Sequence, residues 1–251
     1  MRINYLGTAT AVAIVGVWEA LVRTGVLTFD YLPAPSSILA SVGELVTDDD
    51  LGGRILHTAW VALVAWVIAL GVAFVVGVAV ALSPRTWRYS MASIEVLRTI
   101  PAVALVPVAL LVFGPTRDAE IVVAVYAGCW PLLISVSAGV QATPGRLLEV
   151  ARQMRLSRSR VVVSLRIPAA APLILSGARL ALAVCLVVCV LAEMLGNPEG
   201  LGAGIVERQI ALQPEQMWVY VIAVAVLGTV LNATLLAGSR IAFPRILTRP
   251  V

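Results

Sequence analysis

Long apolar segments constrain this chain more than any other feature of its sequence. Each is long enough to cross the hydrocarbon layer of a membrane, because about 20 helical residues rising about 1.5 Å each span roughly 30 Å. The six segments are Leu6–Val22, Leu56–Leu82, Ile94–Phe113, Ala119–Val140, Ala169–Leu195 and Met217–Gly238. The pattern predicts an all-α, polytopic transmembrane bundle of six helices, with residues 1–251 forming a single domain.

The overall composition supports lipid as part of this chain's solvent. Apolar residues make up 60% of the chain and charged residues only 13%, and the mean hydropathy is +0.98. A soluble domain carries about 25% charged residues. The net charge of +4 does not indicate nucleic-acid binding, because the basic residues stand between apolar segments without interleaved aromatics. The first segment is retained as a helix rather than a signal peptide, since Trp18 and Glu19 occupy the place of a cleavage site.

The placement of the arginines predicts the orientation of the six helices. With a cytoplasmic N-terminus, only Arg23, Arg54, Arg117 and Arg208 lie outside. The other fourteen are Arg2, Arg85, Arg88, Arg98, Arg146, Arg152, Arg155, Arg158, Arg160, Arg166, Arg179, Arg240, Arg245 and Arg249. Because basic residues concentrate on the cytoplasmic side, both termini are predicted to be cytoplasmic.

The chain lacks the residues that common enzyme classes need. All 18 basic residues are arginines, so no lysine is present for a nucleotide-binding P-loop. His57 is the single histidine, and we expect it to be an interfacial side chain rather than a ligand. Cys129, Cys185 and Cys189 fall inside apolar segments without the spacing of a metal site, which favours a helix-packing role. We therefore predict no catalytic, cofactor-binding or metal-binding residues in this chain.

A polar segment between the fourth and fifth apolar segments, residues 143–168, is the most informative part of the sequence. Leu147, Leu148, Val150, Ala151 and Met154 recur in it at helical spacing, which predicts an amphipathic helix on the cytoplasmic side. The orientation rule explains the arginines of this segment, but not the spacing between its other residues.

Residues in this segment resemble the cytoplasmic loop of binding-protein-dependent ABC importer permeases. That loop reads Glu-Ala-Ala, then a Gly four residues after the second Ala, then Ile-x-Leu-Pro. Here the motifs are Glu149-Val150-Ala151 and Leu165-Arg166-Ile167-Pro168, and Arg155 stands at the Gly position. A glycine there permits a left-handed turn, so we expect Arg155 to keep the bend right-handed or less tight.

Three further motifs resemble the nitrate, sulfonate and taurine branch of the same family. They are Leu32-Pro33-x-Pro35-Ser36, the run from Arg98 to Pro107, and Ala192-Glu193-Met194 followed by Gly200-Leu201-Gly202. The resemblance implies a permease subunit of a bacterial inner-membrane importer that moves a small solute by alternating access. A sulfonate, nitrate or taurine is the solute that the branch suggests.

The resemblance also implies partners and site residues. Two copies of the permease pair in the membrane, two ATPase subunits that bind ATP and Mg²⁺ dock beneath them, and an external binding protein delivers the solute. The residues assigned to ATPase coupling are Leu148, Glu149, Val150, Ala151, Met154, Arg155, Leu156, Ser157, Leu165, Ile167 and Pro168.

Four residues are predicted to belong to the translocation pathway or its gate. Pro101 and Pro107 lie in the third segment, where each removes a helix hydrogen bond and favours a kink. Glu193 and Met194 lie near the outer end of the fifth segment, at an outer gate or as a helix end at the interface.

The main alternative is a secondary transporter or channel that works without ATP. Ion coupling requires ionisable residues inside the membrane, and Glu19 and Glu193 are nearly all that the apolar segments offer. Gly71 and Gly77 in the second segment are expected to permit close helix packing.

Overall fold

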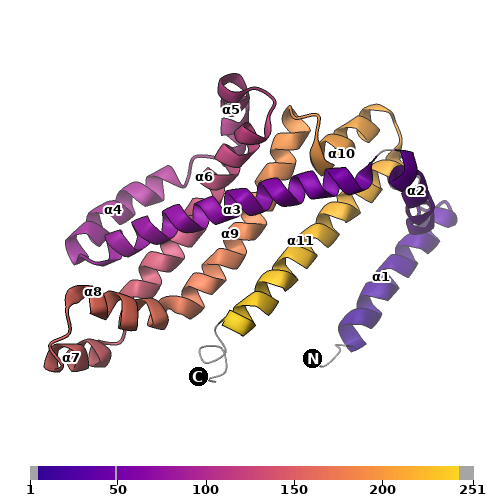
Figure 1. Ribbon diagram of the computed structural model, residues 1–251. Coiled ribbons are helices and arrows are strands. Elements are labelled where there is room, and N and C mark those ends of the chain that lie inside the picture. Colours follow the sequence, from indigo (N-terminus) through magenta and orange to yellow (C-terminus); the bar gives the residue numbers. More distant parts are fainter. Residues whose placement is uncertain (1–4, 49, 243–251) are drawn as a thin grey trace.

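The regular secondary structure of the described chain is helical throughout. The computed structural model describes residues 5–48 and 50–242, and no strand occurs within these ranges (Figure 1). Arg2, Arg245 and Arg249, three of the arginines that bear on orientation, lie outside them. The all-α fold predicted from the sequence is confirmed.

Five of the described helices are long and apolar enough to cross a membrane. They are α1 (Tyr5–Arg23), α3 (Leu51–Ala81), α6 (Arg117–Gln141), α9 (Ile167–Leu195) and α11 (Pro214–Ala242). A helix satisfies its own backbone hydrogen bonds, which a chain in lipid requires. The prediction of a polytopic membrane protein is therefore confirmed.

The third predicted segment is not a continuous helix. It divides into the end of α4 (Pro84–Leu97), a short 3₁₀ turn η1 (Ala102–Leu105) and α5 (Val106–Phe113), and the two arms are bent by 69°. Pro101 precedes η1 and Pro107 lies in the first turn of α5. A proline lacks the N–H that a helix interior needs, so both prolines begin helices here instead of kinking one.

The bent pair α4–α5 is a sixth candidate crossing when its two arms are counted as one span. In Figure 1, α4 begins where α3 ends, and α5 ends beside the start of α6 at the opposite end of the bundle. The start of α1 and the end of α11 both lie toward the end that carries α7 (Gly145–Gln153) and α8 (Arg158–Val161). This arrangement is the one expected when the bent pair is counted as one of six crossings.

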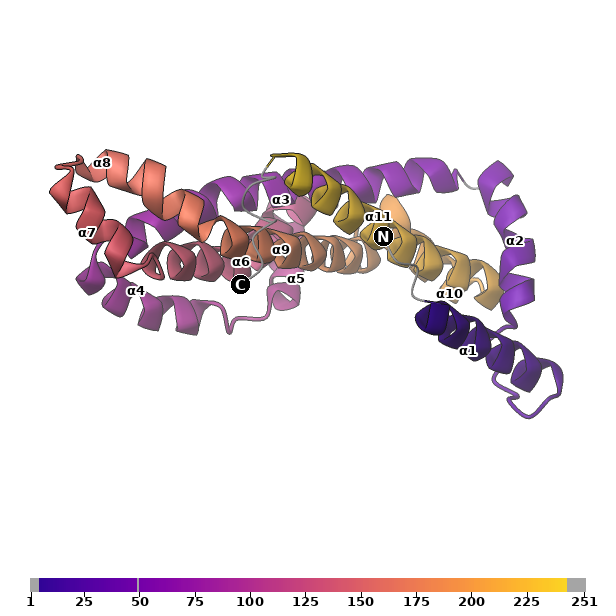
Figure 2. The same ribbon diagram turned by 90° about the horizontal axis from the view of Figure 1, so that it is seen from below.

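The core of the bundle is formed by α3, α6 and α9, which run side by side (Figures 1 and 2). Its contact positions carry small side chains, among them Ala65, Ala69, Ala124, Ala181 and Cys185, all fully buried. A Cβ added to Gly128 of α6 would lie 2.4 Å from Cys185 Sγ. Small residues let helix backbones approach closely, and packing of this kind stabilises helix association in lipid.

Helices at the end of the bundle opposite α7 and α8 join the periphery to this core. The α2 helix (Pro35–Asp48) follows α1, and its Ser36 donates from both its backbone N–H and its hydroxyl to the Glu19 carboxylate, at 3.0 and 2.7 Å. The Glu19 carboxylate thus accepts hydrogen bonds from the first turn of α2. The α10 helix (Gly200–Ile210) lies between α9 and α11 along the chain and packs against both.

The two glycines of α3 differ in what surrounds them, and this yields a matched pair of substitutions. Gly77→Ala would place a Cβ 2.9 Å from Val136 Cγ1 and 3.2 Å from the Leu133 carbonyl oxygen, so overpacking should lower the unfolding free energy by about 1–3 kcal/mol. Gly71 has no neighbour within 4 Å, and Gly71→Ala should be neutral or stabilising by up to about 1 kcal/mol.

Thermal unfolding of the two purified variants in detergent checks this prediction. Equal melting temperatures for Gly71→Ala and Gly77→Ala would contradict the helix contact described here, because both changes add the same methyl group to the same helix.

Candidate functional site

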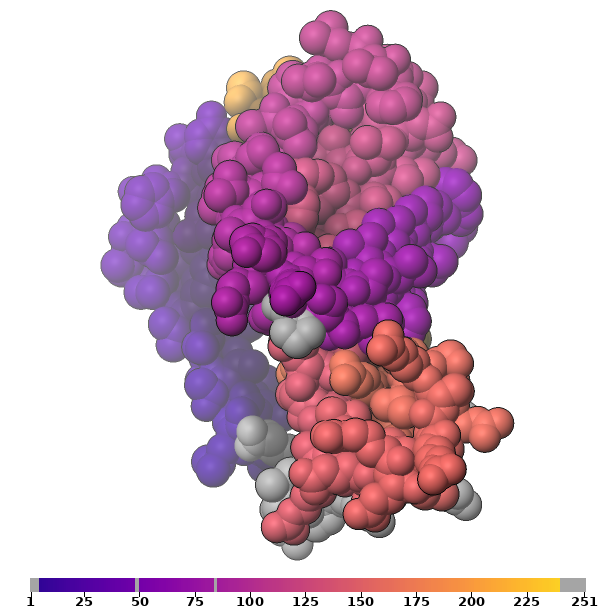
Figure 3. All heavy atoms as spheres, turned by 90° about the vertical axis from the view of Figure 1, so that its left-hand side faces the viewer, coloured from indigo at the N-terminus to yellow at the C-terminus, as the bar shows by residue number. Residues whose placement is uncertain are grey.

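The predicted coupling residues all lie in one lobe at an end of the bundle, visible below α3 and α4 in Figure 3. Helix α7 carries Leu148, Glu149, Val150 and Ala151, and the turn after it is formed by Met154, Arg155, Leu156 and Ser157. The π-helix η2 (Val162–Arg166) contains Leu165, and α9 begins with Ile167 and Pro168. Ala151 is buried, whereas Glu149 and Val150 are exposed. The helix therefore packs by one face and presents the opposite face outward.

The outward face of this lobe carries charges that the described chain leaves unpaired. The Glu149 side chain makes no hydrogen bond or ion pair within the described residues. The same is true of the side chains of Arg146, Arg152, Arg155, Arg158, Arg160 and Arg166. Unpaired guanidinium groups and an unpaired carboxylate are suited to charge-assisted hydrogen bonds with another protein.

The turn after α7 has the hydrogen bonds of a Schellman motif. The Leu156 N–H donates to the Ala151 carbonyl at 3.0 Å, and the Arg155 N–H donates to the Arg152 carbonyl at 3.0 Å. In this motif the residue after the cap is left-handed and is usually glycine. Arg155 occupies that position with φ = 50°. The expectation of a right-handed bend at Arg155 is therefore wrong: the motif's two hydrogen bonds hold the arginine in the conformation that glycine favours.

The segment after this turn leads into the membrane without a break. Helix α8 continues through η2 into α9, and the candidate membrane span runs from Arg158 to Leu195. The Ile167 N–H donates to the Val162 carbonyl, five residues earlier, as a π-helix requires. Pro168 has no N–H for the usual bond four residues back, and the π register begins just before it. A displacement of α8 is thus transmitted directly to α9.

A cavity of about 700 Å³ lies within this lobe and reaches the bundle at Leu82, just after α3. Its other lining residues include Leu148 of α7 and the arginines Arg152, Arg158 and Arg166.

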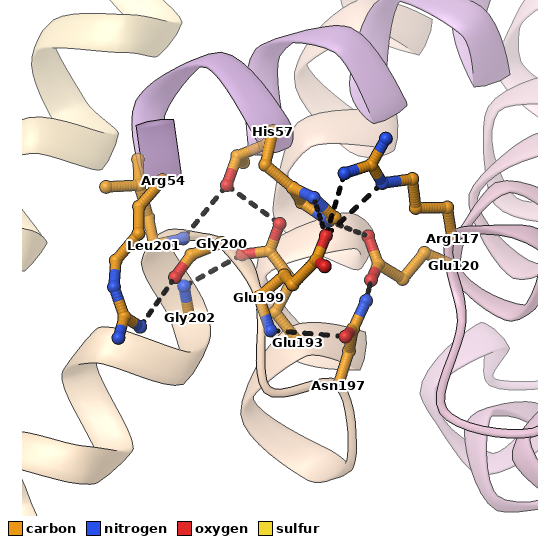
Figure 4. A network of polar contacts seen from close by, with 11 residues as sticks. Arg54, His57, Arg117, Glu120, Glu193, Asn197, Glu199, Gly200, Leu201 and Gly202 are labelled. Carbon is orange, nitrogen blue, oxygen red and sulfur yellow. Dashed lines mark hydrogen bonds and ion pairs between the residues drawn. The ribbon is translucent and has the colours of Figure 1, made fainter. Parts of the chain in front are cut away.

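A second polar constellation lies at the opposite end of α9, around Glu193 (Figure 4). The Glu193 carboxylate is 1% exposed and accepts hydrogen bonds from Thr58 Oγ1 at 2.7 Å and from the Gly202 N–H at 2.8 Å. Thr58 in turn accepts from the Leu201 N–H at 3.0 Å. Glu193 thus joins α3, α9 and the first turn of α10. Met194 is half-buried and packs against the apolar core.

The Gly-Leu-Gly motif is explained by its contact with Glu193. A Cβ at Gly202 would lie 2.2 Å from the Val190 carbonyl oxygen, so only glycine fits. Gly200 has φ = +91°, and a Cβ there would lie 2.3 Å from Glu193 Cδ. The two glycines let the start of α10 approach the carboxylate closely enough to donate to it.

His57 is buried in this constellation, not interfacial as the sequence suggested. Its Nδ1 lies 2.8 Å from Glu199 Oε2 and its Nε2 lies 3.4 Å from Glu120 Oε2. Glu120 is fully buried and accepts from the side-chain amide of Asn197. Arg117 Nη2 pairs with Glu199 at 2.8 Å, and the hydrogen bond from this guanidinium lowers the pKa of the exposed Glu199 carboxyl from its ordinary value.

Sequence reasoning identified Glu193 but not the residues that surround it. Thr58, Glu120 and Asn197 come from parts of the chain far apart in sequence, and the fold alone brings them together. The available signal was an ionisable residue within an apolar segment, which usually has a polar partner. The predicted gate residues divide between two places, since Pro101 and Pro107 lie in the broken helix and outside this polar constellation.

The described chain is thus a membrane bundle with one bent helix pair and a continuous helical link from the lobe of residues 143–168 to α9. A family model described as "Binding-protein-dependent transport system inner membrane component" matches residues 73–248, and the chain belongs to that family. It is the membrane-spanning permease subunit of an ABC importer, a multi-pass inner-membrane protein that is not itself an enzyme.

Individual relatives agree with this family. The SsuC permease of Bacillus subtilis, named for aliphatic sulfonate transport, is 28% identical over 222 residues, which cover 88% of this chain and 80% of that protein. The nitrate import permease NrtB of Synechococcus elongatus is 27% identical over 196 residues, covering 74% and 70%. Among solved structures, an inward-facing MetNI methionine ABC transporter shares the fold, with a TM-score of 0.58 at 18% identity over 72% of this chain and 94% of that one.

The left-handed conformation of Arg155 makes a prediction about stability. Arg155→Gly should raise the unfolding free energy by up to about 1 kcal/mol. It removes the cost of about 1–2 kcal/mol that a non-glycine residue has in the left-handed region, while the greater freedom of glycine in the unfolded chain lowers stability by about 0.5–1 kcal/mol. Arg155→Val should lower it by about 1 kcal/mol or more, since a β-branched residue is strained further.

Thermal unfolding of the purified permease measures both changes. Val150→Gly, in the middle of α7 and exposed, is the control and should be destabilising by about 0.5–1 kcal/mol because a helix interior disfavours glycine. A loss of stability in Arg155→Gly similar to that of Val150→Gly would refute the left-handed turn.

Proposed function

We propose that this chain, as a single transmembrane domain, forms the translocation pathway for a small anionic or zwitterionic nutrient such as a sulfonate, nitrate or taurine. The support is its similarity to the sulfonate-named SsuC and the nitrate-named NrtB permeases. An ATP-independent carrier is not favoured, because the family is one of binding-protein-dependent importers, and because Glu19 and Glu193 hold the starts of neighbouring helices.

We propose that two copies of the chain pair, and that two ATPase subunits and an external solute-binding protein complete the importer. ATP and Mg²⁺ bind to the ATPase subunits in this arrangement. The family description itself names a binding-protein-dependent system, which supports the external partner. The exposed charges around α7 support a protein partner on the other side.

The contact with the ATPase is assigned to residues 143–168, with Glu149 at its centre. Four observations support this role: Glu149 is exposed, it lacks a partner in the described chain, it lies on a helix whose other face is packed, and it is flanked by unpaired arginines. Leu148, Ala151 and Leu156 hold the helix in place, while Val150 and Met154 add exposed apolar surface beside the carboxylate.

Alternating access follows from how α9 is held at its two ends. At the inner end, α8 and η2 join α9 directly to the lobe formed by residues 143–168. At the outer end, Glu193 joins it to Thr58 of α3 and to α10. A movement of the ATPase would therefore tilt α9 together with its neighbours as one body, and the bend at Pro101 provides a separate element for the pathway or gate.

The cytoplasmic side of the membrane is assigned to the lobe and to both termini. The arginine distribution supports this orientation, with fourteen arginines on that side and four on the other, as the positive-inside rule expects.

Reversing the charge of Glu149 tests the docking role. Glu149→Arg should weaken assembly with the ATPase at least tenfold in a pull-down titration, because like-charge apposition at a desolvated contact costs several kcal/mol and each 1.4 kcal/mol is about tenfold. Folding should be unaffected, since Glu149 is exposed and has no partner in the described chain.

The matched control is Asp30→Arg, an equal charge reversal at an exposed position in the turn between α1 and α2. It should leave ATPase binding unchanged. Wild-type assembly and transport by Glu149→Arg would remove the role proposed for this glutamate.

Labelling with a membrane-impermeant maleimide tests the orientation. In a variant whose Cys129, Cys185 and Cys189 are replaced by alanine, cysteines introduced at the exposed positions Asp30 and Ser157 should react from opposite sides. Intact cells should label the first and inside-out vesicles the second. Labelling of both from one side would overturn the six-crossing arrangement.

A further inference from the structure

The constellation around Glu193 places two buried carboxylates beside one imidazole. One ligand atom each from His57, Glu120 and Glu193 lies within 4.8 Å of the others, and all three residues are buried (Figure 4). Two carboxylates removed from water repel each other and lose their hydration, so either protons or a nearby cation stabilise them. Arg117 pairs with the exposed Glu199, and Arg54 pairs with Glu207.

The placement of His57 between carboxylates fits a metal-bound histidine. Metal-ligating histidines usually have a carboxylate near one ring nitrogen, which leaves the other nitrogen for the metal. His57 Nδ1 lies 2.8 Å from Glu199 Oε2, and Nε2 lies on the side of Glu120.

The distance between His57 Nε2 and Glu120 Oε2 supports the same interpretation. It is 3.4 Å, longer than the usual N–H···O distance of about 2.7–3.2 Å. Two ligand atoms about 2.0–2.2 Å from one tetrahedral ion are separated by about 3.3–3.6 Å. Glu120 Oε2 and both His57 nitrogens are buried without a hydrogen bond that meets normal geometry.

Each of the two carboxylates is held in place by other groups. Glu120 uses its Oε1 to accept from the Asn197 amide, leaving Oε2 directed at His57. Glu193 is fixed by Thr58 and by the Gly202 N–H. Hydrogen bonds of this kind orient the ligands in natural metal sites.

We propose that His57 Nε2, Glu120 Oε2 and the Glu193 carboxylate bind one divalent first-row metal ion, for which Zn²⁺ is the probe. One nitrogen and two carboxylate ligands suit such an ion, and its two positive charges balance the two buried carboxylates. The site joins α3, α6 and α9 at the end of the bundle opposite the lobe formed by residues 143–168. The sequence predicts no metal site, because the three ligands are far apart along the chain.

Metal content of the purified full-length chain tests the proposal. After treatment with EDTA, equilibrium dialysis against Zn²⁺ and elemental analysis should find one zinc per wild-type chain. His57→Ala and Glu120→Gln should each lose it. Glu95→Gln, an exposed carboxylate on α4, is the control and should bind like wild type. Zinc in the wild type no higher than in His57→Ala overturns the proposal.

A second variant keeps the test valid if the buried substitutions prevent folding. Glu199 is exposed, so Glu199→Gln should fold, and loss of the group that orients His57 should weaken zinc binding about 10–100-fold without changing the stoichiometry at saturation. Unchanged zinc affinity in Glu199→Gln would contradict the assignment.

Thermal unfolding adds a readout that does not depend on counting metal. Zinc should raise the melting temperature of the wild type and of Glu95→Gln, but not that of His57→Ala, because a ligand stabilises only the state that binds it. A melting temperature that follows pH but not zinc would mean that protons neutralise the carboxylates, and this too overturns the proposal. Neither readout involves transport, so failure here leaves the proposed function intact.

Discussion

Lipid does not drive helices together as water does, so this bundle depends on how closely the backbones of α3, α6 and α9 can approach. Small residues make that approach possible wherever these helices meet. A Cβ at Gly177 would lie 2.4 Å from Ser135 Cβ, and one at Gly139 would lie 3.0 Å from Ala170 Cβ. Dispersion contacts at such short range supply the attraction that the hydrophobic effect supplies in water. Both polar regions of the molecule are positioned by this packing, because α9 carries one at each end.

Hydropathy predicted the membrane helices well because the physical requirement is simple. Backbone groups in lipid must be satisfied within their own segment, so an apolar run of sufficient length has to be helical. The form of the third segment did not follow from this rule. Pro101 and Pro107 are compatible with a kinked helix and with two short helices, and the choice depends on tertiary contacts that hydropathy does not contain.

The two polar regions differ in how much of them the sequence predicted. The coupling residues lie within 26 consecutive positions, so spacing alone placed them in one lobe, 143–168. The turn at Arg155 was wrongly predicted because residue preference suggested a right-handed bend, whereas two hydrogen bonds of the motif impose the left-handed one. At the opposite end of α9, Glu193 was singled out for its charge, but its partners Thr58 and Gly202 and its neighbours His57 and Glu120 depend on long-range packing.

The π-helix between α8 and α9 has a consequence for how motion crosses the membrane boundary. Its hydrogen bonds span five residues instead of four, so Val162–Arg166 holds one residue more than an α-helical turn of the same bonding would. Moving that extra residue along the helix would exchange one bond for another and turn the residues that it passes by about 100°, the angle of one residue at 3.6 residues per turn, while the helices on either side keep their orientation. The junction between α8 and α9 thus has an adjustable register in a segment that stays hydrogen-bonded.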